Sequence, residues 1–177
     1  MKPLVLSYEL TWRTKEDEKF SKSTEWKKIR QEILARDNST CQYCGYRSES
    51  RMQINHIDGN PKNNAPANLE VVCTLCHMIM HSGLWAAVRK TMILFKVAEY
   101  SQNEIIRITR EMRSKGASDN EIIEHLGLRK QVEWRQDMGY LSKLYGFITS
   151  NKPHKSGSKP LLTEEEQCRR IERQRLK

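Results

Sequence analysis

The chain has 177 residues, which is enough for one domain with an appendage or for two small domains. Its hydrophobic share of 37% and charged share of 30% are typical of a soluble protein with small individual cores, in which a bound metal ion would add stability. The formal net charge of +9 and the isoelectric point near 9.4 favour nucleic acid over membrane as the partner. The first residues lack the apolar region of a signal peptide, and no apolar run is long enough to span a membrane. We therefore expect a cytoplasmic protein with reduced thiols and no membrane contact.

The N-terminal part, residues 1–22, is predicted to be an extension with a strand over residues 4–10 and a charged bend over residues 15–19. Ser23 and Thr24 are both good helix caps, and the apolar spacing after them predicts a helix that ends near Arg36. One face of this helix would carry Trp26, Ile29, Ile33 and Leu34, which we interpret as core residues.

Four of the five cysteines form two Cys-x-x-Cys pairs, Cys41 with Cys44 and Cys73 with Cys76. Two such pairs separated by a loop-rich span have the ligand spacing of a tetrahedral four-thiolate zinc site. Disulfides would need an export signal, and a redox Cys-x-x-Cys would need a thioredoxin-like βαβ context, and neither is present. The spacing therefore predicts a structural zinc ion.

Polar residues with recognisable spacing lie between and after the cysteine pairs. Asn55-His56-Ile57 follows an apolar, strand-like stretch that breaks at Asp58-Gly59. Asn68-Leu69 comes next, and the second cysteine pair is followed directly by His77 and then by His81. Taken together, residues 24–82 resemble the HNH endonucleases of the four-cysteine type.

This resemblance implies an α+β, mostly helical fold with a ββα-metal core in a nuclease domain over residues 23–98. It implies hydrolysis of DNA phosphodiester bonds, with catalytic roles for His56, Asn68 and His77. His56 would be the general base and Asn68 would fix the loop that orients it. Asn55 and His77, with His81 as a third ligand, would hold a divalent cation such as Mg²⁺ or Mn²⁺ or another transition metal. The metal ligands of the structural zinc would be Cys41, Cys44, Cys73 and Cys76.

The chain departs from the family at Asn55, because the family usually has Asp before the base. An amide oxygen binds hard cations without contributing charge, so Mg²⁺ affinity should fall and two imidazoles should favour softer transition ions. Asp58 is an alternative donor, although its Asp-Gly context equally fits a turn.

The predicted helix after the second cysteine pair, from Cys73 to about Val88, would separate two sets of ligands. Successive residues are about 100° apart around a helix, so Cys76 and His77 cannot point at the same ion. Cys73 and Cys76 would share one face, and His77 and His81 would share another.

The remainder is predicted to be helical. Residues 84–98 should continue as a core helix, and capping boxes at Ser101 and Ser118 should open two helices that end at Gly116 and Gly127. A third helix over residues 130–148 would complete a helix-turn-helix domain at residues 99–150 whose Arg129, Lys130, Gln131 and Arg135 contact DNA. A helical bundle that docks on the nuclease or on a partner protein is an equal alternative. Residues 151–177 are predicted to be a polar linker and a charged segment.

A competing hypothesis is an inactive zinc-dependent DNA-binding or adaptor module. The presence of His56, Asn68, His77 and His81 together favours the nuclease, because a zinc knuckle alone has no need for all four. Phage defence, restriction and mobile elements are all compatible settings, and a defence-system nuclease would have a regulatory protein partner.

Overall fold

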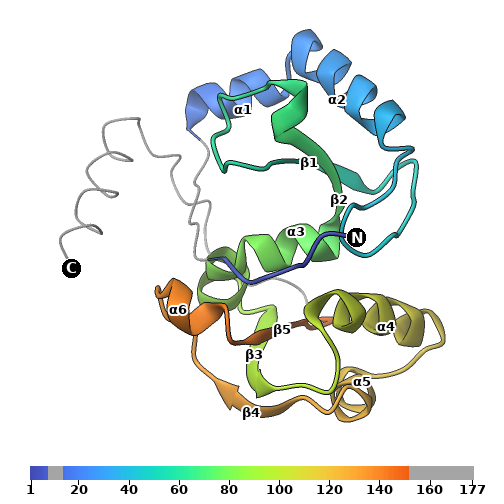
Figure 1. The fold of residues 1–177 in the computed structure, drawn as a ribbon, viewed down its shortest axis with the longest axis vertical. Helices are drawn as coiled ribbons and strands as arrows, with labels where there is room; N and C mark the ends of the chain where they lie inside the picture. The colour runs from blue at the N-terminus through green and yellow to red at the C-terminus, as the bar shows by residue number, and fades with distance from the viewer. Residues whose placement is uncertain (8–13, 152–177) are drawn as a thin grey trace.

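A computed structural model describes residues 1–7 and 14–151 (Figure 1). In chain order the helices are α1 (Lys15–Ser21), α2 (Thr24–Arg36), α3 (Thr74–Met80), α4 (Gln102–Ser114), α5 (Asp119–His125) and α6 (Met138–Leu141). The strands are β1 (Met52–His56), β2 (Leu69–Cys73), β3 (Met92–Val97), β4 (Arg129–Val132) and β5 (Tyr145–Ile148). A 3₁₀ turn at Pro66–Asn68 precedes β2, and a π-helical turn at Gly83–Val88 follows α3. Helices combined with small antiparallel sheets make this an α+β protein.

Strands β1 and β2 form an antiparallel hairpin between two helices, with α2 on one side and α3 on the other (Figure 1). The register pairs Ile54 with Val71 and Asn55 with Glu70. Since side chains alternate across a strand, these two pairs point to opposite faces of the hairpin. Every residue of β2 is buried, which fits a strand that is covered by a helix on each face.

A second sheet has the strand order β4-β3-β5, and α4 and α5 pack against it (Figure 1). Helix α4 also covers the outer edge of β5. The Gln102 amide donates to the Gly146 carbonyl (2.9 Å) and accepts from the Gly146 N–H (2.7 Å), while Arg113 donates to the Ile148 carbonyl. These side chains supply hydrogen bonds that another strand would supply, so α4 is fixed to the sheet edge.

The core is continuous between the two halves. One cluster of buried apolar side chains extends from the hairpin and α3 to Leu94 on β3 and Ile106 on α4. A second, smaller cluster joins the sheet to α4 and α5. Its buried members are Phe95, Ile105, Ile122, Leu126, Leu128 and Phe147. The half that contains α4 is therefore packed directly against the half that contains the cysteines.

Three helices are predicted correctly from their caps. Helix α2 runs from Thr24 to Arg36 with Ser23 as its N-cap, and α4 and α5 begin with the expected capping boxes at Ser101 and Ser118. Gly116 and Gly127 have positive φ angles of 87° and 60° directly after these two helices, a conformation that glycine adopts without steric cost.

The predicted third helix over residues 130–148 is wrong. This segment forms β4, the four-residue helix α6 and β5, so the expected helix-turn-helix arrangement of three helices is replaced by two helices and a sheet. The continuous helix predicted over residues 84–98 is also wrong, because residues 92–97 are strand β3. Pairing of β3 with two strands supplies hydrogen bonds on both of its edges, and this outweighs the helical spacing of the apolar residues.

At the N-terminus, the charged bend expected over residues 15–19 is instead helix α1. Residues 4–7 belong to neither sheet, although Leu4 and Leu6 are buried, and residues 8–10 of the predicted strand lie outside the described residues. The expected linker after residue 151 and the charged segment up to residue 177 also lie outside them.

Candidate nuclease site and metal centre

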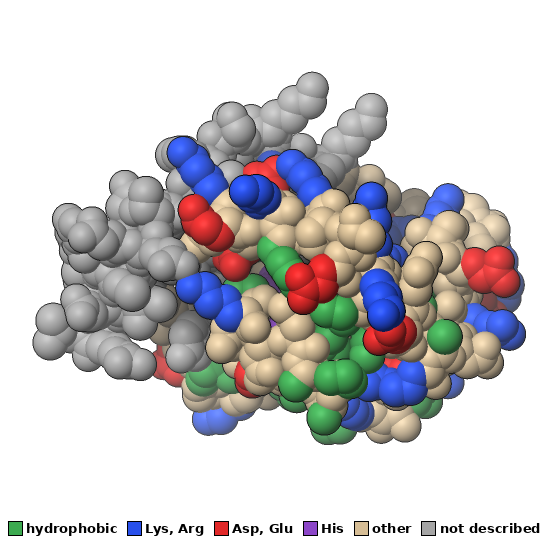
Figure 2. Space-filling model, turned by 90° about the horizontal axis from the view of Figure 1, so that it is seen from above, with side chains coloured by type: hydrophobic (Ala, Val, Ile, Leu, Met, Phe, Trp, Pro, Cys, Tyr) green, Lys and Arg blue, Asp and Glu red, His purple; other side chains and the backbone are tan. Residues whose placement is uncertain are grey.

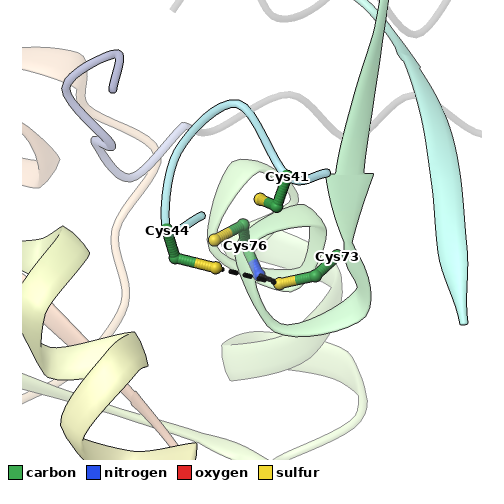
Figure 3. A group of neighbouring side chains, drawn as sticks. All are labelled: Cys41, Cys44, Cys73 and Cys76. Carbon is green, nitrogen blue, oxygen red and sulfur yellow. Dashed lines mark hydrogen bonds between the residues drawn. The ribbon is translucent and has the colours of Figure 1, made fainter. Parts of the chain in front are cut away.

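The four cysteines come from three elements and converge in the core. Cys41 and Cys44 lie on the turn between α2 and β1, Cys73 ends β2, and Cys76 lies in α3 (Figure 3). All four are buried, and their sulfur atoms lie within 4.8 Å of one another. Among the described residues, these four cysteines are the one group of three or more cysteine, histidine or acidic side chains that could together hold a metal ion.

The local chain geometry explains why the sulfur atoms meet. Gly45 has a φ of 72° and its N–H donates to the Cys41 carbonyl, which closes the turn between the first two cysteines. Cys73 is the N-cap of α3, and its sulfur accepts a hydrogen bond from the Cys76 N–H at 3.5 Å. The strand end and the first turn of the helix thus direct the second pair toward the first.

The four residues fit a structural zinc ion. Tetrahedral zinc with Zn–S bonds of about 2.3 Å requires sulfur atoms about 3.8 Å apart, and the sulfur atoms of Cys44 and Cys73 are 3.6 Å apart. Hydrogen bonds from the neighbouring thiols, led by Cys41, lower the pKa of the Cys73 thiol, whereas hydrogen bonds in the same cluster, again led by Cys41, raise the pKa of Cys44 and Cys76. Four thiolates side by side repel one another, so a bound cation is what would hold all four in that form. Four sulfur ligands leave no open position for a substrate, so such an ion would be structural.

Arg110, on α4, lies against this cluster. Its guanidinium donates to the sulfur of Cys73 at 3.1 Å and lies over the ring of Tyr46, 3.6 Å from the centroid. Burial alone would lower the pKa of Arg110, but the hydrogen bond to Cys73 and the charge of the thiolates raise it. Helix α4 therefore contributes one positive charge to a site that carries negative charge on its sulfur atoms. No sequence motif includes Arg110, which lies 37 positions after Cys73.

His56, the predicted base, ends β1. Its ring stacks on Trp26 of α2, with centroids 5.7 Å apart and planes 14° apart, and its Nε2 is 3.0 Å from Oδ1 of Asn64. The amide oxygen of Asn64 only accepts hydrogen bonds, so in this arrangement Nε2 carries the proton and the lone pair is on Nδ1. Trp26, interpreted from the sequence as a core residue, therefore orients the imidazole.

Asn68 fixes the loop that follows His56. Its side-chain amide donates to Oδ1 of Asp58 and to the carbonyl of Asn63, both at 2.9 Å, and its oxygen accepts from the Asp58 N–H. Hydrogen bonds from the Asn60 N–H and then from Asn63 and Asn68 lower the pKa of Asp58. Both oxygens of Asp58 are used within the loop, which supports its interpretation as a turn residue over that of a cation ligand.

Asn55 forms a hydrogen bond with a residue that is not part of the HNH motif. Its Nδ2 donates to Oε1 of Glu70 at 3.0 Å, directly across the hairpin. The same carboxylate accepts from the Tyr43 hydroxyl at 2.8 Å and forms a salt bridge with Lys2 at 2.6 Å. Burial, followed by the bond to Glu70, raises the pKa of Tyr43. Glu70 could have been identified from the sequence, because it is the single acidic residue in the otherwise apolar stretch Leu69–Cys73.

His77 lies on α3 and His81 is the C-cap residue of that helix, and their Nε2 atoms are 3.1 Å apart. Their rings meet edge to face with centroids 4.5 Å apart. Cys76 takes part in the sulfur cluster, so adjacent residues of this helix belong to two separate groups, as the 100° spacing predicts.

A cavity of about 670 Å³ brings most of the predicted residues together. Its lining includes Asn55, His56, Glu70, His77 and His81. Asn68 and the four cysteines do not line this cavity. The sulfur cluster and the hydrogen bonds of Asn68 to the loop after His56 are therefore separate from it. On the face viewed from the side of α1 and α2, histidine and hydrophobic side chains lie recessed among lysine, arginine and acidic side chains (Figure 2).

Comparison with known proteins identifies a segment that includes Asn55, His56 and Glu70 and ends before His77 and His81. Residues 41–75 match a family model described as HNH endonuclease. This segment is therefore similar to the HNH endonucleases. A curated relative, the type 4 apparatus protein DotN of Legionella pneumophila, is 36% identical over 70 residues. The match covers 40% of this chain and 30% of the length of DotN, and the name of that protein states a component of an apparatus rather than an enzymatic activity.

Every helix in the described part of the chain is too short or too polar to cross a membrane.

Proposed function

We propose that this chain is a metal-dependent HNH endonuclease that hydrolyses DNA phosphodiester bonds. The observation that supports the proposal best is the single cavity that contains Asn55, His56, His77 and His81 beside a four-cysteine centre. A zinc module that only stabilises a fold has no need for a stacked, tautomer-fixed histidine and a histidine pair in the same cavity.

His56 acts as the general base. Its Nδ1 takes a proton from the attacking water while the new phosphorus–oxygen bond forms and the bond to the 3′ oxygen breaks. The hydrogen bond of Nε2 to Asn64 and the ring of Trp26 hold the imidazole in one orientation. Asn55, His77 and His81 would hold a divalent cation, which would stabilise the charge on the phosphate and on the leaving oxygen.

Basic residues outside the cavity are the proposed DNA contacts. Arg129 and Lys130 are exposed on β4, and Arg135 follows that strand and stacks on the ring of Tyr140. Neutralising these three residues together should reduce the salt dependence of DNA binding, with a change in slope of about 2 to 3. An unchanged slope would exclude this half of the protein as a DNA contact.

The decisive experiment is cleavage of supercoiled plasmid by the purified, zinc-loaded chain with Mg²⁺, Mn²⁺ or Ni²⁺. His56→Ala should abolish cleavage while DNA binding and zinc content are retained, because the base acts only on the attacking water. The matched control is His125→Ala, which removes a histidine that stacks on Tyr100 far along the chain. Equal cleavage by His56→Ala and the wild type would refute the proposed mechanism.

A second candidate is a zinc-stabilised docking module in a larger assembly. The similarity to a type 4 apparatus protein favours it, as does the engagement of Asn55 by Glu70 in place of the usual Asp. This candidate predicts no cleavage with any of the three cations and no effect of His56→Ala on assembly. The plasmid assay therefore distinguishes the two.

A further inference from the structure

The buried carboxylate of Glu70 has no role in the mechanism given above. Its side chain is 3% exposed, and it lines the same cavity as Asn55 and the histidine pair. A carboxylate is rarely buried without a partner, because removing its charge from water is costly. Here it has three partners, namely Asn55, Tyr43 and Lys2.

The hydrogen bond between Asn55 and Glu70 fixes the direction of the amide. An ionised carboxylate only accepts hydrogen bonds, so the NH₂ group of Asn55 must face Glu70. The oxygen of the planar amide group then points away from Glu70. Tyr43 and Lys2 also donate to the carboxylate, which holds it in place and makes the opposite amide orientation unfavourable.

The same contact explains why an asparagine suits position 55. An aspartate there would place a second carboxylate about where the Asn55 nitrogen lies now, 3.0 Å from Glu70. Two carboxylates at that distance do not both stay ionised. One acidic residue and one amide, paired across the hairpin, supply the charge of one carboxylate without that repulsion.

We propose that Glu70 is a positioning residue for the cation site, holding the Asn55 oxygen toward the cavity and supplying the negative charge that the family usually has at position 55. This inference rests on the proposed function for the location of the cation. The positive charge of Lys2 partly offsets the negative charge of Glu70. The Lys2 side chain is 49% exposed and reaches the buried carboxylate from the protein surface. Removing Glu70 and removing Lys2 should therefore change cation affinity in opposite directions.

The test measures binding of Mn²⁺ alone to the zinc-loaded chain, by the loss of the free-ion electron paramagnetic resonance signal. A His77→Ala/His81→Ala double variant first identifies which bound Mn²⁺ belongs to the cavity. Glu70→Gln should weaken that binding about 10- to 100-fold, the effect of losing an outer partner of a metal ligand. Lys2→Gln should strengthen it about two- to fivefold, as expected for one half-exposed charge.

A reciprocal exchange separates positioning from a structural role. Asn55→Asp alone should not strengthen Mn²⁺ binding, because the new carboxylate opposes Glu70. Asn55→Asp/Glu70→Gln reverses the pair, with the amide donating to the carboxylate, and should restore affinity to at least the wild-type value. If the exchange restores the melting temperature but leaves Mn²⁺ binding weak, the inference is overturned.

The remaining outcomes separate this inference from the proposed function. A folded Glu70→Gln chain that binds Mn²⁺ and cleaves plasmid like the wild type overturns the role of Glu70 and leaves the nuclease intact. Opposite effects of Glu70→Gln and Lys2→Gln on Mn²⁺ binding, without plasmid cleavage, support the cation site and refute the nuclease. A wild-type chain that neither binds Mn²⁺ in the cavity nor cleaves refutes both.

Discussion

Arg110 provides a quantitative test of how α4 acts on the metal centre. Arg110→Met removes the guanidinium but keeps a side chain of similar length. The variant loses a hydrogen bond to a charged sulfur and a cation–π contact with Tyr46, which are 3.1 Å and 3.6 Å in length. A hydrogen bond to a charged group contributes about 1.5–3 kcal/mol. Because 1.4 kcal/mol corresponds to a factor of about ten, zinc should bind about 10- to 150-fold more weakly.

Competition with a chelator of known zinc affinity measures this change. The matched control is Arg107→Met, which removes an exposed arginine from the same helix and should leave zinc affinity within about twofold, since surface charges contribute little. Arg110→Lys keeps the charge but loses the planar fork, so it should give an intermediate value. A folded Arg110→Met variant with the affinity of the wild type would refute the view that this guanidinium stabilises the thiolates.

Three further predictions concern stability. Gly146→Ala should destabilise the fold by about 1–3 kcal/mol in urea unfolding, because its Cβ would lie 2.8 Å from Cδ1 of Ile79 in the core. Asp37→Asn should lower the free energy of unfolding by about 1 kcal/mol at pH 7. Because the hydrogen bond from Arg36 lowers the pKa of Asp37, the stability difference between the wild type and the variant should be complete above about pH 4 and should vanish as the pH falls through the lowered pKa. Cys73→Ser should lose zinc by metal analysis and unfold at lower temperature, and a folded, zinc-free Cys73→Ser chain with unchanged stability would exclude a structural zinc.

The elements that could be predicted from the sequence are those with local signals. Ser101 and Glu104 cap the same helix end, three residues apart, and this contact does not depend on the rest of the fold. The cysteine pairs are similar, because each Cys-x-x-Cys brings two sulfur atoms together within one turn. Only the meeting of the two pairs requires the fold, and the hairpin between them supplies it.

The helix prediction for residues 130–148 was wrong because it relied on the local spacing of apolar residues, whereas the structure of this segment depends on pairing with distant residues. Leu141 and Leu144 have helical spacing and are buried, yet Leu141 is the last residue of the short helix α6 and Leu144 directly precedes β5. Strand β5 exists because it pairs with β3, more than 40 residues earlier, and because Gln102 and Arg113 supply hydrogen bonds to its other edge. No window of the sequence contains both partners.

The same distinction applies within the site. The motif identifies His56, His77 and the cysteines because the family spacing names them, but it does not name the groups that orient them. Trp26, Asn64, Glu70 and Arg110 reach the site from α2, the hairpin loop, β2 and α4, respectively. These contacts depend on packing between elements, and they decide the tautomer of His56, the direction of the Asn55 amide and the charge near the sulfur atoms.

Helix α3 links the sulfur cluster to the cavity. It is seven residues long, and it carries Cys76 on one side and His77 on another. Because Cys73 and Cys76 fix the start of this helix, a metal bound by the cysteines would also fix the rotation that directs His77 and His81 into the cavity. Loss of zinc should therefore weaken Mn²⁺ binding in the cavity even though no cysteine lines it. Measuring Mn²⁺ binding in a zinc-depleted chain that retains its helical circular dichroism tests this coupling, and unchanged Mn²⁺ affinity would mean that the hairpin alone positions the histidines.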